Sequence, residues 1–343
     1  MALLEVKDLK VHFKIQNGWV KAVDGISFTI DRGETLGLVG ESGCGKTTAA
    51  YAITQLLPSN GYIKGGHIYY KGSDLLQLSL RKDGTLDDYN KDIRKIRWKE
   101  ISMIFQGAMN AFNPVFKVGD QIIEAIQLHE DVDDETAKKR VEELFDFVGI
   151  RRDRINNYPH EFSGGMKQRA MIALALALSP SFIIADEPTT ALDVITQDRI
   201  LFEITKLQDK LNMAMMIITH DVSVVAEVSD KIAVMYAGKL MEIGMTSDVF
   251  KDTAHPYTAG LLGSFPSIRG PRRRLTSIPG SPPDLVNPPP GCSFHPRCRY
   301  KKDICSKEMP QGITMRPGHM SYCHFAKELS EELRRGGESD GGA

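Results

Sequence analysis

The sequence has no apolar run long enough to cross a membrane. Its longest apolar segments, MIALALAL and AMMII, are far shorter than the ~18 residues that a membrane-spanning helix requires. The first residues, MALLEVKDLKVHF, carry charges early and lack the apolar core and cleavage site of a signal peptide. These absences predict a cytoplasmic protein that other subunits would have to hold at a membrane.

An excess of charge of one sign is also missing. The 343 residues include 43 basic and 44 acidic side chains, which gives a net charge of −1. Proteins that bind nucleic acid non-specifically usually carry a basic excess, so this balance argues against that class. The chain is long enough for one large α/β domain with a small appendage.

Cysteine is scarce and unevenly distributed. Cys44 stands alone among the five cysteines, and the other four gather near the C-terminus: Cys292, Cys298, Cys305 and Cys323. In a reducing compartment such a group more often binds metal than forms disulfides. None of them forms the C-x₂₋₄-C pair that is usual in zinc knuckles. Four thiolates at wide spacing are compatible with a [4Fe–4S] cluster, with zinc or free buried thiols as alternatives.

Predicted strands and helices alternate along the first three quarters of the chain. Residues 1–35 read as antiparallel strands with a turn near Gly18, and the apolar runs ETLGLVG, ISMIFQ, FIIAD, MMIIT and KIAVMYAG read as buried strands. Residues 118–150 and the segment GGMKQRAMIALALAL have helical spacing. The alternation predicts an α/β fold with a largely parallel sheet. A helical lobe is expected at about 107–175.

The composition changes after about residue 265, where prolines become frequent. We therefore predict three parts. A main domain spans 1–265, a proline-rich irregular extension with the four-cysteine group spans 266–330, and a disordered tail spans 331–343.

The segment from Gly40 to Thr47 fits the pattern G-x-x-x-x-G-K-[ST] and lies between an apolar strand and a helix. Glycines let backbone amides wrap a phosphate chain, and the helix adds its positive end. Lys46 can reach the outer phosphates, and the Thr47 hydroxyl can bind Mg²⁺. The strand and helix on either side favour ATP binding over a simple glycine-rich turn. The predicted nucleotide contacts here are Gly40, Ser42, Gly43, Cys44, Gly45, Lys46, Thr47 and Thr48.

Two carboxylates, Asp186 and Glu187, follow the apolar strand FIIAD. At the end of a buried strand beside a phosphate loop, Asp186 suits the binding of Mg²⁺. Glu187 is then placed to orient or deprotonate the attacking water. By themselves, such a pair could equally be solvated carboxylates at a strand end.

Ser163, Gly164 and Gly165 lie just before a long predicted helix. Their hydroxyl and backbone amides would form a second anion site at the helix N-terminus. An ordinary helix cap with a flexible entry turn explains these residues equally well.

Taken together, these segments resemble the nucleotide-binding subunits of ABC transporters. Gly40 to Thr47 looks like the Walker A motif, the strand ending at Asp186 looks like Walker B, and Ser163-Gly164-Gly165 looks like the core of the ABC signature. The motifs occur in family order over roughly residues 3–250. The resemblance implies an ABC-type P-loop ATPase core with a helical lobe and a small C-terminal metal-binding unit.

Further residues match the family pattern one by one. Gln106 fits the Q-loop, which would sense both Mg²⁺ and a membrane subunit. His220 fits the switch histidine that contacts the γ-phosphate, and Asp193 fits the D-loop. Phe13 lies where the family usually stacks an aromatic ring on adenine, with Trp19 as a weaker candidate.

The resemblance also implies an assembly. Two such domains close head to tail around two ATP molecules, so Ser163 to Gly165 would contact nucleotide bound to the partner. This chain has one phosphate loop. It would therefore pair with a second ABC ATPase, and family precedent favours a related, non-identical chain.

A narrower resemblance is to the ATPases of dipeptide and oligopeptide permeases, including relatives that import nickel. It rests on YPHEFSGGMKQR, on His255-Pro-Tyr-Thr258 and on the segment from Gly291 to Cys298 with Cys305 and Cys323 after it. It implies a [4Fe–4S] cluster on the four cysteines.

The narrower resemblance implies ATP-driven uptake of short peptides at the cytoplasmic face of the membrane. The assembly would include two transmembrane permease subunits and an external peptide-binding protein, and no nucleic acid. Nickel or another small solute is the alternative substrate. An ABC ATPase acting on nucleic acid is a more distant alternative.

Overall fold

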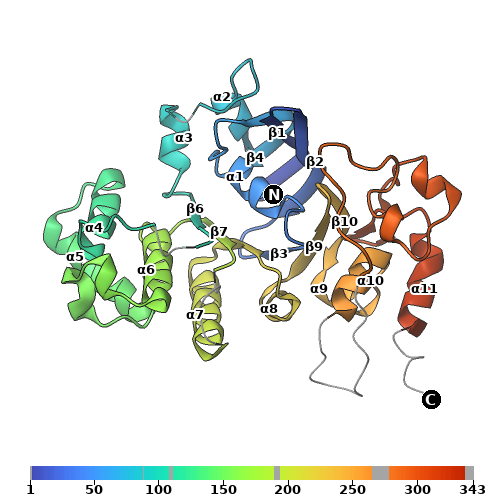
Figure 1. Cartoon of the computed structure of the whole chain (residues 1–343). Coiled ribbons are helices and arrows are strands. Elements are labelled where there is room, and N and C mark those ends of the chain that lie inside the picture. The colour runs from blue at the N-terminus through green and yellow to red at the C-terminus, as the bar shows by residue number, and fades with distance from the viewer. Residues whose placement is uncertain (1, 88, 108–110, 189–193, 265–277, 337–343) are drawn as a thin grey trace. The chain divides into compact units, whose positions relative to one another are not determined.

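The computed structural model describes residues 2–87, 89–107, 111–188, 194–264 and 278–336 (Figure 1). They form two compact units. The first unit contains Met1–Thr29, Thr35–Asp87 and Thr219–Ala343, and the second contains Ile30–Glu34 and Asp88–Ile218. Each unit therefore combines segments that are distant in the sequence.

The N-terminal strands of the first unit form a four-stranded sheet in the order β2-β1-β4-β5. Their bounds are Leu4–Ile15 (β1), Gly18–Ile30 (β2), Gly61–Tyr70 (β4) and Ser73–Asp74 (β5). Alternate residues of a strand point to the same face. In β1 the buried side chains follow this rule on either side of a bulge near Lys7, and they are Leu4, Val6, Leu9 and Val11.

A second set of strands in the first unit runs in the order β11-β12-β10-β9-β3. The strands are Thr35–Val39 (β3), Lys231–Tyr236 (β9), Lys239–Met245 (β10), Ile313–Arg316 (β11) and His319–Ser321 (β12). β3 and β9 are parallel, and the pairings from β9 to β11 are antiparallel. β11 and β12 come from the C-terminal extension, so the extension continues the sheet of the first unit.

Helices of the first unit are short. They are α1 (Lys46–Ile53), α2 (Leu75–Ser79), α8 (Val222–Val228), α9 (Thr246–Lys251), α10 (Pro256–Gly263) and α11 (Ala326–Gly336). The predicted disordered tail begins at residue 331, but α11 continues to Gly336. Its first turns pack Ala326, Leu329 and Ser330 into the protein, which explains helical order beyond the predicted boundary. Residues 337–343 lie outside the described part.

The extension packs its aromatic residues into the core of the first unit. The rings of Tyr236 at the end of β9, Tyr257 in α10 and Phe294 in the extension lie 4.6–5.3 Å apart in pairs. Cys292 and Cys305 belong to the same buried cluster. These contacts bury apolar surface that neither segment could bury alone, which is the main source of stability in such a junction.

The second unit contains three parallel strands in the order β8-β7-β6. They are Ile101–Ile104 (β6), Phe182–Asp186 (β7) and Ala214–Ile218 (β8). Every residue of the three strands is buried. Continuous apolar runs of this kind are typical of parallel strands that are covered on both faces.

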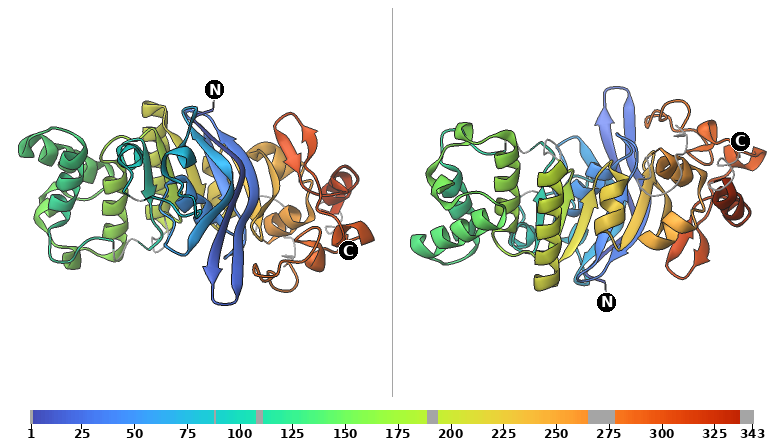
Figure 2. Two further views of the ribbon diagram at one scale, coloured as in Figure 1. Left: turned by 90° about the horizontal axis from the view of Figure 1, so that it is seen from above. Right: turned by 90° about the horizontal axis from the view of Figure 1, so that it is seen from below.

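Helices α4, α5 and α6 pack together in the second unit and appear as the green bundle in Figure 2. The unit's helices are α3 (Lys91–Ile96), α4 (Val118–His129), α5 (Asp134–Phe147), α6 (Gly164–Leu176) and α7 (Val194–Leu211). The predicted helical stretch 118–150 is thus two helices. Asp133 separates them because its side chain accepts the backbone N–H of Thr136 and caps α5. None of the described helices combines the length and apolar character needed to span a membrane.

Candidate nucleotide site and cysteine cavity

The phosphate loop connects β3 to α1 in the first unit, and its glycines occupy positions that other residues could not. Gly40 has φ 154°, and a Cβ there would lie 2.0 Å from the carbonyl oxygen of Met235. Gly45 has φ 106°, and a Cβ there would lie 2.0 Å from the carbonyl oxygen of Ala22. Close backbone approach therefore requires glycine at both positions.

The start of α1 is open to an anion. Gly45 makes no side-chain capping bond, and the first turn contains no acidic residue. Ser42 and Gly43 are exposed, while Thr47 and Thr48 are partly buried. Backbone amides and the helix dipole at such an end favour phosphate.

The Lys46 side chain lies against the loop. Its side chain is 8% exposed, and Nζ donates to the carbonyl oxygens of Gly40 at 2.8 Å and Glu41 at 3.0 Å. The Lys46 Nζ also lies 3.6 Å from the Cys44 Sγ. The ammonium group is therefore held inside the loop, where a bound phosphate chain would be its alternative partner.

Cys44 is buried inside the loop, with 4% of its surface exposed. Burial raises the pKa of its thiol, and the nearby Lys46 ammonium opposes that rise. The side chain therefore fills space as a neutral thiol, and only its backbone is available to a phosphate.

The predicted catalytic residues of the second unit lie together. Asp186 ends β7 and is 1% exposed, and Glu187 follows with an unusual positive φ of 49°. The backbone N–H of Glu187 donates to Ile218 O at 2.8 Å, and its Oε2 accepts a hydrogen bond from Gln106 Nε2 at 2.8 Å. Strain of this kind is typical of functional sites. The hydrogen bond between Gln106 and Glu187 joins two residues that are 81 positions apart in the sequence.

Ser163 caps α6, and its side chain accepts the N–H of Met166 at 3.3 Å. Ser163 is exposed, Gly164 and Gly165 form the partly exposed first turn, and that turn contains no acidic residue. The cap and the anion site predicted here are compatible, because a serine that caps a helix also lies beside its free amides.

His220 is exposed and lies just before α8 in the first unit. The side chain of the next residue, Asp221, accepts the N–H of Ser223 at 2.8 Å and caps α8. The position thus leaves the imidazole at the surface. Asp193 lies outside the described residues.

The two candidate adenine-stacking residues differ in their surroundings. Phe13 is partly buried on β1, opposite Gly61 of β4. Trp19 packs edge-on against Tyr62 at 5.0 Å and lies under the Lys64 ammonium at 3.8 Å. Since Trp19 already has both an aromatic and a cationic neighbour, the structure gives it a packing role.

The four C-terminal cysteines line one small cavity of about 20 Å³. Burial raises the pKa of Cys292, that of Cys298 to about 11 and that of Cys323 to about 12. Among the described residues, no three His, Cys, Asp or Glu side chains lie close enough to hold a metal ion. The structure therefore brings the predicted thiols together but does not show a metal site. Among the described residues it supports neither the predicted [4Fe–4S] cluster nor the zinc alternative.

Three histidines of the extension lie near the cysteines in the sequence, and each has a polar partner of its own. His319 Nε2 lies 2.8 Å from Oε1 of the fully buried Glu242, and this contact joins β12 to β10. His295 Nδ1 lies 2.9 Å from Cys292 O, and His324 Nε2 lies 2.9 Å from Glu308 O. These contacts help to hold the extension in place, and His295 and His324 line the cavity beside the four cysteines.

Known families match the chain in two neighbouring segments. The family described as ABC transporter matches residues 23–190. The family described as oligopeptide/dipeptide transporter, C-terminal region, matches residues 241–305.

Individual relatives extend this similarity over most of the chain. The oligopeptide transport ATP-binding protein OppD of Bacillus subtilis (strain 168) is 48% identical over 312 residues, covering 90% of this chain and 84% of that protein. The dipeptide transport ATP-binding protein DppD of the same strain is 43% identical over 340 residues, covering 98% of each. A solved dimeric ATP-binding cassette in a post-hydrolysis state, bound to ADP and Pi, matches with a TM-score of 0.62 and 25% identity. That match covers 71% of this chain and 98% of the other.

The chain belongs to the ABC transporter ATP-binding proteins of the oligopeptide/dipeptide group. The predicted ABC-type α/β ATPase fold is thereby confirmed, and so is the prediction that the chain is an ATPase. A metal-binding character of the C-terminal unit is not shown.

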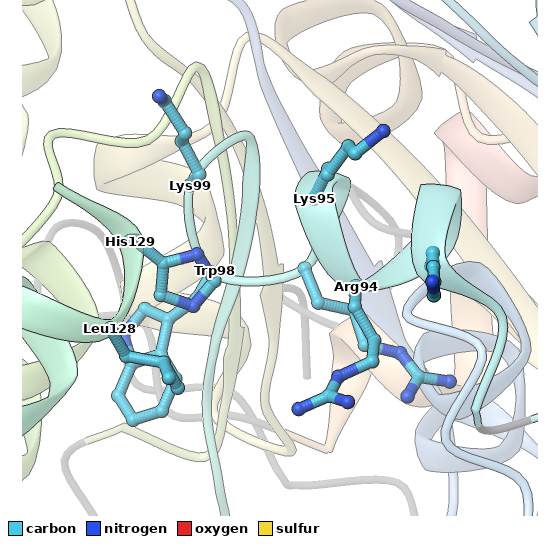
Figure 3. Close-up of a pocket in the computed structure, with 8 residues that line it drawn as sticks. Arg94, Lys95, Trp98, Lys99, Leu128 and His129 are labelled. Atoms are coloured by element: carbon cyan, nitrogen blue, oxygen red, sulfur yellow. The ribbon is translucent and has the colours of Figure 1, made fainter.

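The second unit of this ABC ATPase also has a basic hollow of about 550 Å³ (Figure 3). It is lined by Lys91, Arg94, Lys95, Arg97, Trp98, Lys99, Leu128 and His129. The indole N–H of Trp98 donates to Leu174 O at 2.9 Å. Burial and the nearby cations Lys99 and Arg94 lower the pKa of His129. No carboxylate occurs among the described residues of its wall, so the hollow attracts anions.

Sequence motifs did not identify every residue that supports the ABC ATPase site. Gln168 in α6 is 5% exposed, and its Nε2 donates to Pro188 O just after Glu187, at 2.6 Å. In the phosphate loop, the Glu41 carboxylate accepts a hydrogen bond from Arg297, and the Glu41 backbone N–H donates to the Tyr257 hydroxyl. Tyr257 lies in the segment HPYT and Arg297 in the segment GCSFHPRC. Only the family resemblance of these two segments pointed to the residues.

Proposed function

We propose that this ABC ATPase energises the uptake of dipeptides and oligopeptides. The observation that carries the proposal is the combination of an ATPase site with a C-terminal extension that is packed into the same unit. The relatives with 43–48% identity that are described above are named for oligopeptide and dipeptide transport. Their similarity includes the extension, which a general ATPase would not need.

The proposed roles are those that the resemblance to ABC ATPases implies for these residues. Lys46 and the amides of the phosphate loop bind the phosphates, and Thr47 and Asp186 bind Mg²⁺ together with Gln106. Glu187 orients or deprotonates the attacking water, because its carboxylate lies at the end of β7 and is held by Gln106.

Further contacts in this proposal come from four other positions. Ser163 to Gly165 contact nucleotide on a partner subunit, His220 contacts the γ-phosphate, and Asp193 supports the junction between the two ATPases. Phe13 stacks on adenine.

The proposed assembly follows from the single phosphate loop of this chain. A second, related ABC ATPase completes the pair of sites, and two transmembrane permease subunits hold the pair at the cytoplasmic face of the membrane. An external binding protein delivers the peptide. Within the chain we assign residues 1–265 to ATP binding and hydrolysis and residues 266–330 to the extension.

Peptide uptake in cells tests this function. A strain that lacks the chain should lose uptake of a radiolabelled tripeptide, and the wild-type gene should restore it. Glu187→Gln should not restore uptake, because loss of a general base lowers the rate by about 10²- to 10⁴-fold. Unchanged peptide uptake, together with loss of nickel uptake, would move the function to the alternative substrate.

We also propose that the cysteine cavity holds a [4Fe–4S] cluster on Cys292, Cys298, Cys305 and Cys323. Four thiols line one cavity, and burial raises the pKa of Cys292, Cys298 and Cys323, which makes their bare thiolates unfavourable without a cationic partner. A single tetrahedral zinc ion, with Zn–S bonds of about 2.3 Å, would require sulfur atoms about 3.8 Å apart. A cluster is larger and accepts thiolates that are farther apart. Such a cluster would supply either a structural link or one-electron chemistry.

Analysis of protein purified without oxygen tests the cluster. We expect about four irons and four sulfides per chain and a brown colour, both lost in Cys298→Ser and retained in the matched variant Cys44→Ser. Stoichiometric zinc without iron would replace the cluster with a zinc site. Protein without either metal, from a host that builds clusters, would leave four free thiols.

A further inference from the structure

Arg297 of the extension forms a two-pronged ion pair with the phosphate loop. Its Nη1 donates to Glu41 Oε2 at 2.7 Å and its Nη2 donates to Glu41 Oε1 at 3.0 Å. The arginine side chain is 7% exposed and the glutamate 24%. Bidentate pairs that are shielded from water fix the relative orientation of both groups. The carboxylate next to Gly40 is therefore held by a residue 256 positions away.

The backbone of Glu41 is held as well. Its N–H donates to the hydroxyl of Tyr257 at 3.0 Å, and Tyr257 is fully buried. Its carbonyl oxygen accepts the Lys46 Nζ at 3.0 Å. Every polar group of this loop residue thus has a partner, and two of these partners, Tyr257 and Arg297, come from the segment after residue 254.

Arg297 is itself fixed within the extension. Nε donates to Pro279 O at 2.7 Å, Nη1 donates to the Tyr236 hydroxyl at 3.2 Å, and the guanidinium lies 5.6 Å from the centre of the Tyr236 ring. Arg297 lies in a 3-10 turn between Cys292 and Cys298. A displacement of this turn would move the guanidinium away from Glu41.

The charge of Glu41 makes this contact relevant to nucleotide binding. A carboxylate beside a phosphate loop repels the negative phosphates of ATP, and the repulsion is strong where water is excluded. Arg297 offsets this negative charge because its guanidinium is hydrogen-bonded directly to the carboxylate. It also prevents the carboxylate from turning toward the Lys46 ammonium, which the phosphates need.

We propose that Arg297 is a positioning residue of the nucleotide site, through which the C-terminal extension sets the affinity of the phosphate loop for ATP. It fixes Glu41 and offsets its charge, and it makes no contact with the nucleotide itself. This inference rests on the proposed binding of ATP at Gly40 to Thr47.

Nucleotide affinity of the full-length chain provides the test. Titration with a fluorescent ATP analogue and Mg²⁺ should give a Kd about tenfold higher for Arg297→Gln, which is within the range for residues of one ion-pair network. Arg297→Lys keeps the charge but loses the fork and should give an intermediate Kd. Arg299→Gln removes the same charge from an exposed position nearby and should bind like the wild type.

The double variant Glu41→Gln/Arg297→Gln separates positioning from general stability. If Arg297 acts by offsetting Glu41, removal of both charges should restore most of the lost affinity. An unchanged Kd in Arg297→Gln, an equal loss in Arg299→Gln, or no rescue by Glu41→Gln would each overturn the inference. If Arg297→Gln does not fold, the Kd of Arg297→Lys decides, and a wild-type value refutes the inference. Failure of the wild-type chain to bind ATP would instead refute ATP binding at the phosphate loop.

Discussion

At the scale of single residues, the phosphate loop contains a cysteine that chemistry alone would mark as reactive. Cys44 lies near the N-terminus of α1 and 3.6 Å from the Lys46 ammonium, both of which favour a thiolate. Burial acts in the opposite direction and is the larger influence, so the pKa of the thiol is raised. Desolvation thus dominates over the nearby positive charge.

We predict that Cys44 reacts slowly with iodoacetamide in the native chain. At pH 7 its alkylation should be at least about tenfold slower than in urea, because the native thiol is both buried and neutral. Mass spectrometry of the peptide containing residue 44, over a time course, measures this rate. Equal rates in native and unfolded chains would contradict the predicted protection. Cys44→Ser should bind ATP as the wild type does.

At the scale of elements, helix α10 depends on a neutral histidine. His255 is 1% exposed, and its Nδ1 accepts the backbone N–H of Tyr257 at 3.0 Å as the N-cap. Burial lowers the pKa of His255 from 6.5 to about 3. Between these values the unfolded chain binds a proton that the native chain does not, so native stability falls as the pH decreases below 6.5.

His255→Asn should remove this pH dependence while keeping a capping side chain. Between pH 7.5 and 5.5, the wild type should lose about 1 kcal/mol more of its free energy of unfolding than the variant does. Urea unfolding at the two pH values gives both numbers. An equal loss in wild type and variant would assign the acid sensitivity to other groups.

The strands with continuous apolar runs are among those that the sequence predicts correctly. FIIAD and MMIIT lie in β7 and β8, because a strand covered on both faces needs apolar residues throughout. β11 and β12 were not predicted. Both strands are short. β11 pairs with β12 and β12 pairs with β10, so their order depends on contacts distant in sequence rather than on a local pattern.

The same difference applies to the site. The phosphate loop could be predicted because its glycines and Lys46 follow one another in the sequence. The contact of Gln106 with Glu187 and that of Arg297 with Glu41 join residues 81 and 256 positions apart, and no local pattern encodes such contacts. Family resemblance supplied the role of Gln106. The proposed role of Arg297 could be recognised only from the three-dimensional contacts.

At the scale of the whole molecule, the extension is part of the fold that binds ATP. Its residues continue the sheet through β12, its Phe294 completes the core around Tyr236 and Tyr257, and its Arg297 holds Glu41. The orange and red segments beside β10 in Figure 1 are therefore no detachable appendage. This explains why a proline-rich segment without a large core of its own can remain ordered: its apolar residues are buried in the neighbouring core.

Phe294→Ala tests this unity of the extension and the ATP-binding core. Phe294 is 3% exposed, and loss of a buried phenylalanine ring costs about 3–5 kcal/mol. At about 2–4 °C per kcal/mol, the melting temperature should fall by roughly 6–20 °C. Phe202→Ala removes the same ring from a position that is 61% exposed, and it should lower the melting temperature by no more than about 2 °C. If the two variants melt alike and Phe294→Ala binds ATP like the wild type, the extension folds independently of the nucleotide site. A large fall with one cooperative transition, and weaker ATP binding below it, requires the extension and the phosphate loop to share one core.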